Sequence, residues 1–185
     1  MNELNGFKVA ILAADGFEEV ELEKPRKALE KEGATTYLIS PEDEFVQGWN
    51  HLEVGDTFTV DVPLNEANAA DYDALLLPGG VVNPDKLRII PEAISFIKEI
   101  NKQKKPIAAI CHGPSLLINA GAAKDHKVTF WSSIKLDLIN AGANWVDEPV
   151  VSDDNLVTSR NPQDIPLFNE GMIKLFKLWK KNHHL

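Results

Sequence analysis

The sequence has no excess of basic residues and no apolar run long enough to cross a membrane. With 19 Lys and Arg against 28 Asp and Glu, its net charge is −9, so no basic stripe is available for nucleic-acid phosphates. The apolar run at residues 9–14 is too short for a membrane span, and no basic segment precedes it as in a signal peptide. We therefore expect no nucleic-acid partner and no membrane partner.

Cofactor signatures are also missing. The chain has no G-x-G-x-x-G fingerprint, no Walker loop and no C-x-x-C pair, and its histidines lack the spacing of metal ligands. We expect neither a cofactor nor a metal. The chain has one cysteine, which cannot form an internal disulfide, and a free thiol fits a reducing compartment. This predicts a cytoplasmic protein.

Short apolar strands alternate with helices along the chain, which predicts an α/β fold. The length of 185 residues suits one domain over residues 1–185. Residues 15–24 are expected to form an acidic turn, and residues 45–64 a small hairpin. Strands are expected at 7–13, 35–40, 74–77, 106–110, 128–131, 149–152 and 155–159, and helices at 25–32, 91–103, 115–121, 134–140 and from 161 onward. The pattern indicates a mostly parallel sheet with helices on both faces.

The single cysteine, Cys111, lies where a buried strand meets a turn containing Gly113 and then a helix. This is the thiol counterpart of the strand-to-helix elbow that exposes a nucleophilic serine in hydrolases. A thiol at the positive end of a helix has its pKa lowered from about 8.5 to roughly 3.5–7.5. The alternative is an inert buried cysteine. We favour a reactive thiol because Cys111 follows the carboxyl end of a strand, where parallel sheets bind ligands.

Two other segments are expected at the same edge of the sheet. Glu21 lies beside apolar residues, and its spacing leaves two alternatives open: it points inward, where a protonated carboxyl donates a hydrogen bond to the thiolate, or it is solvated like its acidic neighbours. Glu18 and Glu19 are expected to be solvated. Gly79 and Gly80 end a strand and offer bare N–H groups, either for an oxyanion hole or for a plain tight turn.

Four further roles stay open on the sequence alone. His112 adjoins the cysteine and is a candidate base, unless only its backbone matters. Asp85 is either the carboxylate that orients this base or a helix cap. Trp131 and Arg160 either line a pocket or serve core packing and a surface ion pair, respectively.

These residues give the chain a resemblance to the PfpI family of intracellular cysteine proteases, close kin of the parkinsonism-associated deglycases. The resemblance covers nearly the whole chain. Six motifs carry it, in order: residues 17–22, 75–80, 84–88, 109–114, 139–143 and 157–160.

The resemblance implies a flavodoxin-like three-layer sandwich with a nucleophile elbow. It implies Cys111 as nucleophile, Glu21 as the carboxyl partner of its sulfur, His112 as base, and Gly80 with the His112 N–H as oxyanion hole. It also implies a homodimer or larger ring in which Asp85 of a neighbouring subunit completes a triad. Asp85 stands where protease-like members carry glutamate, and Trp131 replaces a smaller aromatic residue.

Three functions follow from these observations. The first is a PfpI-type cysteine hydrolase of peptide or acyl bonds, acting in general or aldehyde stress protection. The second is a glyoxalase or deglycase acting on small aldehydes or early glycation adducts. The third is a non-catalytic redox sensor or chaperone-like stress protein, in which Cys111 is oxidised.

Overall fold

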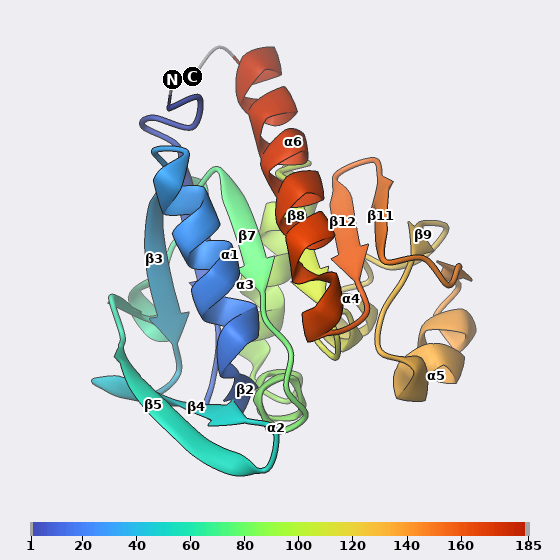
Figure 1. Ribbon diagram of the computed structural model, residues 1–185, viewed down its shortest axis with the longest axis horizontal. Helices are drawn as coiled ribbons and strands as arrows, with labels where there is room; N and C mark the ends of the chain where they lie inside the picture. The colour runs from blue at the N-terminus through green and yellow to red at the C-terminus, as the bar shows by residue number, and fades with distance from the viewer. Residues whose placement is uncertain (1, 184–185) are drawn as a thin grey trace.

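The protein is built on a mostly parallel seven-stranded sheet (Figure 1). This computed structural model describes residues 2–183. The strand order is β11-β12-β8-β7-β1-β3-β6, and only β11 runs antiparallel to its neighbour. The strands are β1 (Lys8–Leu12), β3 (Thr35–Ser40), β6 (Val62–Pro63), β7 (Ala74–Leu77), β8 (Ile107–Ile110), β11 (Val150–Asp153) and β12 (Leu156–Ser159). The predicted mostly parallel sheet is confirmed.

Both faces of this sheet are covered, because alternate residues of each central strand enter different cores. In β1, Val9 and Ile11 pack in one core while Ala10 and Leu12 pack in the other, and all four are fully buried. The first core includes residues of α1 (Glu19–Lys31) and α6 (Ile165–His183), which cross in front of the sheet in Figure 1. The second includes residues of α2 (Val82–Leu87), α3 (Pro91–Lys102), α4 (Ser115–Asn119) and α5 (Lys135–Asn140). Helices therefore flank the sheet on both sides, as expected.

Smaller elements extend from this body. β2 (Phe17–Glu18) pairs in parallel with β4 (Phe45–Asn50), which forms the predicted hairpin with β5 (Glu53–Thr59). β9 (Lys127–Val128) and β10 (Asn144–Trp145) form a separate two-stranded sheet. Short 3-10 turns lie at Leu64–Glu66, Ala69–Asp71, Ser132–Ile134 and Pro162–Asp164. Among residues 2–183, no helix combines the length and the apolarity needed to span a membrane.

Two sequence-based predictions are wrong in their boundaries. The first helix begins at Glu19 instead of near Pro25, which lies inside it. The buried stripe of Glu21, Leu22, Pro25 and Leu29 follows helical spacing, so packing outweighs the missing proline N–H. The strand expected at 128–131 ends at Val128, because its partner β10 is only two residues long.

A glycine-dependent loop follows β7 at the carboxyl edge of the sheet. Gly80 has φ +76°, and a Cβ there would lie 2.7 Å from the Glu18 backbone nitrogen and closer still to the Gly16 carbonyl oxygen. Backbone atoms cannot move aside as a flexible side chain does. This loop therefore requires glycine for both its conformation and its close approach to the β1–β2 segment.

We expect Gly80→Ala to lower the free energy of unfolding by about 2 kcal/mol or more, through strain and steric overlap. Gly121→Ala is the matched control, because Gly121 has φ +67° with nothing within 4 Å of its added Cβ. Its cost is limited to the backbone term of about 1 kcal/mol. Urea unfolding measures both, and equal losses would show that the close contact at Gly80 is unimportant.

Candidate active site

Cys111 occupies a sharp bend between β8 and α4. Its φ of +62° is unusual for a residue with a side chain, and its N–H donates to the Ser159 carbonyl oxygen at 3.0 Å. Gly113 N–H donates back to Ile110 O at 2.9 Å, which closes the turn. The predicted elbow is present, and it holds the sulfur off the end of the sheet in a strained backbone conformation.

The environment of the Cys111 sulfur differs from the sequence-based expectation. The residue is only 7% exposed, and burial raises its thiol pKa. Negative charge on Glu21 raises this pKa further, while the backbone N–H groups of His112 and Gly80 lower it. The predicted lowering by a helix terminus is wrong, because α4 has five residues and starts at Ser115, four positions beyond the sulfur.

Glu21 lies against this sulfur, as the family resemblance implies, and it is fully buried. Burial raises the pKa of Glu21 to about 8, and the charge of Glu18 acts in the same direction. Gly79 N–H donates to Glu21 Oε2 at 2.8 Å, whereas Oε1 has no hydrogen-bond partner among the described residues. A proton on Oε1 relieves that deficit. The carboxyl is therefore largely neutral at pH 7 and available as a hydrogen-bond donor beside the thiol.

His112 faces the sulfur with one ring nitrogen. Its Nδ1 is 3.3 Å from Cys111 Sγ, and its Nε2 is 3.2 Å from the Ser133 hydroxyl. The ring stacks on Trp131 with 5.9 Å between ring centroids. Burial lowers the pKa of His112, so its imidazole is neutral at pH 7 and can accept a proton from the thiol.

The two glycines after β7 have different partners. Gly79 N–H is engaged by Glu21, so its predicted role as a free oxyanion donor is not supported. A Cβ on Gly79 would also come within 2.8 Å of Cys111 Cβ. The N–H groups of Gly80 and His112 face the sulfur, where they lower its pKa. That these two donors also stabilise a developing oxyanion stays a prediction.

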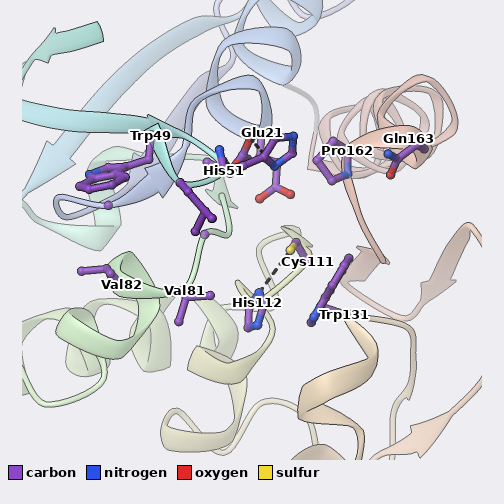
Figure 2. Close-up of a pocket in the computed structure, with 14 residues that line it drawn as sticks. Glu21, Trp49, His51, Val81, Val82, Cys111, His112, Trp131, Pro162 and Gln163 are labelled. Carbon is purple, nitrogen blue, oxygen red and sulfur yellow. Dashed lines mark hydrogen bonds and ion pairs between the residues drawn. The ribbon is translucent and has the colours of Figure 1, made fainter. Parts of the chain in front are cut away.

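A cavity of about 510 Å³ opens above Cys111 (Figure 2). In Figure 2 the sulfur lies between Glu21 on one side and His112 and Trp131 on the other. The lining residues are Gly16, Glu18, Glu21, Trp49, His51, Leu52, Gly80, Val81, Val82, Cys111, His112, Trp131, Pro162 and Gln163. The structure thus brings together five of the eight residues predicted for the site.

Asp85 and Arg160 do not line this cavity. Arg160 donates to Asp147 at 2.9 Å and to Asp164 at 2.8 Å, so the ion-pair alternative is confirmed and the pocket role is wrong. Asp85 is exposed on α2, and the partner of His112 within residues 2–183 is Ser133 instead of a carboxylate. Contact between His112 and Asp85 of a second subunit stays a prediction.

Sequence reasoning missed the wall formed by the β4–β5 hairpin. Glu18 and Glu19 are 9% and 8% exposed, so the prediction that they are solvated is wrong. Their carboxylates accept hydrogen bonds from backbone N–H groups of this hairpin, Glu18 from His51 at 3.1 Å and Glu19 from Asp56 at 2.7 Å. The alternating pattern of residues 45–64 predicts a hairpin but carries no signal for where it packs.

We expect the pH midpoint of iodoacetamide labelling of Cys111 to lie above the ordinary value of about 8.5, because burial raises the thiol pKa. Glu21→Gln removes the negative charge that develops near pH 8, so its midpoint shifts to lower pH. Glu19→Gln is the control and leaves the midpoint unchanged. An unshifted midpoint in Glu21→Gln would contradict the coupling of the two groups.

Comparison with known proteins agrees with this architecture. Residues 7–175 match the model of the DJ-1/PfpI family. The chain is 43% identical over 175 residues to General stress protein 18 of Bacillus subtilis, covering 93% of this chain and 99% of that protein. It is 39% identical over 170 residues to Deglycase PfpI of Pyrococcus furiosus, covering 92% and 99%.

Solved structures share the fold. A two-domain protein from Anabaena variabilis with DJ-1/ThiJ/PfpI-like and ferritin-like domains has a TM-score of 0.85 and 34% identity, covering 91% of this chain and 47% of that one. DJ-1beta of Drosophila melanogaster has a TM-score of 0.81 at 24% identity, covering 97% and 98%, which shows the fold alone. The flavodoxin-like expectation is confirmed, and the chain belongs to the DJ-1/PfpI family.

Proposed function

We propose that the protein is an enzyme of stress protection that uses Cys111 to attack the carbonyl carbon of small aldehydes or early glycation adducts. The observation that carries this proposal is the position of a buried, largely neutral Glu21 carboxyl beside a thiol that has His112 Nδ1 at 3.3 Å. Two proton-carrying groups therefore flank one nucleophile. Relatives named as a general stress protein and a deglycase, at 43% and 39% identity, support the same choice.

The first step is addition to the carbonyl. His112 Nδ1 takes the thiol proton while the sulfur forms a bond to the carbonyl carbon, and the carbonyl π electrons move to oxygen. The N–H groups of Gly80 and His112 stabilise that oxygen until a proton from imidazolium or from Glu21 neutralises it. The product is a hemithioacetal, and no atom is oxidised or lost.

The second step needs a proton to move between neighbouring carbons when the substrate is a 2-oxoaldehyde. Loss of the proton from the sulfur-bearing carbon and its return to the adjacent carbonyl carbon yields a thioester of a 2-hydroxy acid. Water then hydrolyses the thioester and frees the thiol. Glu21 has a pKa of about 8, so it both gives and takes protons at neutral pH, which suits this transfer.

Hydrolysis of peptide bonds is the second candidate. The observation that favours it is the apolar rim of the cavity, where Leu52, Val81 and Val82 are exposed and offer contact area for a peptide side chain. Aldehyde chemistry is preferred because amide hydrolysis needs a strongly oriented base, and His112 is held by the neutral Ser133 hydroxyl. Casein cleavage that is lost in Asp85→Ala would favour the peptidase and a triad completed by a second subunit.

We expect Cys111→Ser to lower kcat/KM for methylglyoxal by about 10³-fold or more, because a hydroxyl is a far weaker nucleophile than a thiol beside the same base. Consumption of methylglyoxal and formation of lactate measure this, with thermal unfolding as a check on folding. Full turnover in Cys111→Ser would contradict the proposal. Turnover of casein but not of methylglyoxal by the unmodified protein would favour the peptidase instead.

A further inference from the structure

The cavity above Cys111 is lined by acidic side chains and histidines. Its ionisable lining residues are Glu18, Glu21, His51, Cys111 and His112, and none of the lysines and arginines within residues 2–183 lines it. Glu21 is largely neutral at pH 7, since burial raises its pKa to about 8. The Glu18 carboxylate therefore supplies the negative charge that an entering molecule meets.

Contacts with the β4–β5 hairpin fix the position of Glu18 in the cavity lining. It lies on β2, paired with Trp49 of β4, and only 9% of the residue is exposed. Its Oε2 accepts the His51 N–H at 3.1 Å, and its Oε1 lies 3.6 Å from His51 Nδ1. The His51 side chain is 81% exposed, so this partner faces solvent while the carboxylate stays fixed.

The field of Glu18 reaches the reacting groups. Its charge is one of the causes that raise the pKa of Glu21, the carboxyl next to the sulfur. Glu21 also lines the cavity, and its buried Oε1 has no hydrogen-bond partner among residues 2–183. Apolar walls strengthen electrostatic effects by excluding water, and the faces of Trp49 and Trp131 favour cations.

We propose that Glu18 makes this cavity charge-selective, so that it accepts uncharged and positively charged carbonyl compounds and rejects those that carry a carboxylate or phosphate near the reacting carbon. As a statement about substrates, this inference rests on the proposed function. As a statement about access to Cys111, it is testable without any turnover.

Alkylation of the single cysteine tests that access directly. Iodoacetamide and iodoacetate are close in size, and in both the thiolate attacks the carbon and displaces iodide into solution, but only iodoacetate is an anion. We expect the rate constant for iodoacetamide divided by that for iodoacetate, at pH 7.5, to be at least about fivefold larger for Cys111 than for the small thiol N-acetylcysteinamide. The reason is repulsion between the Glu18 carboxylate and the iodoacetate anion at contact distance. Taking a ratio cancels any change in the fraction of thiolate.

Two variants locate the origin of the selectivity. Glu18→Gln brings the ratio to within about twofold of the small thiol. Glu19→Gln is the matched control, because it removes the same charge from the adjacent, equally buried residue, which lies outside the cavity lining. It keeps the wild-type ratio. Equal ratios in the two variants, or a wild-type ratio like that of the small thiol, would overturn the inference.

Two further measurements make the result independent of folding and of the proposed function. Raising the salt concentration from 0.02 to 0.5 M lowers the wild-type ratio toward that of the small thiol, and an unchanged ratio counts against Glu18. Methylglyoxal and 4,5-dioxopentanoate are a neutral 2-oxoaldehyde and a 2-oxoaldehyde that carries a carboxylate, and Glu18→Gln is expected to narrow the difference between their kcat/KM values. Charge-selective alkylation without turnover of either aldehyde would refute the proposed function and leave the selectivity intact.

Discussion

The burial of the Glu21 carboxyl against the Cys111 sulfur is the interaction on which the site depends. The Gly79 N–H fixes one carboxyl oxygen, and the other has no hydrogen-bond partner among residues 2–183. Because burial raises the pKa of Glu21 from 4.5 to about 8, the folded protein keeps a proton that the unfolded chain releases. The stabilising contribution of this protonation is complete below pH 4.5 and is lost as the pH rises toward 8. The contribution of Glu21 to the free energy of unfolding is therefore smaller at neutral pH than at acidic pH, as a consequence of holding its protonated carboxyl next to the Cys111 thiol.

The contact between Glu21 and Cys111 depends on the strand ends, on the loops that follow them and on the β4–β5 hairpin. β1, β7 and β8 end at the same edge of the sheet, which brings the segment before α1, the Gly79–Gly80 loop and the Cys111 elbow together. The left-handed conformations of Gly80 and Cys111 permit the close approach of these loops. The β4–β5 hairpin then closes one side of the cavity and fixes Glu18 within it.

The fold and the central residues of the site could be predicted from the sequence because they are encoded locally. The buried strands before Gly79 and Cys111 place both loops at the same sheet edge, and Glu21 lies next to apolar Leu22 on a buried stripe. Tertiary contacts determine whether the pKa of Cys111 is raised or lowered. They also determine the positions of Glu18, Ser133 and Arg160. The run of acidic residues predicts a solvated Glu18, because the sequence does not show that a backbone N–H group of the hairpin, that of His51, binds its carboxylate.

The most direct test of this account is to titrate the Glu21 carboxyl itself. Carbon-13 NMR of protein labelled at the glutamate carboxyl carbons, with Glu21→Gln to assign the signal, follows its ionisation with pH. The account predicts a midpoint near 8 for Glu21. A midpoint near 4.5, the ordinary value for a glutamate, would mean that a carboxylate faces the sulfur at neutral pH and would contradict the account.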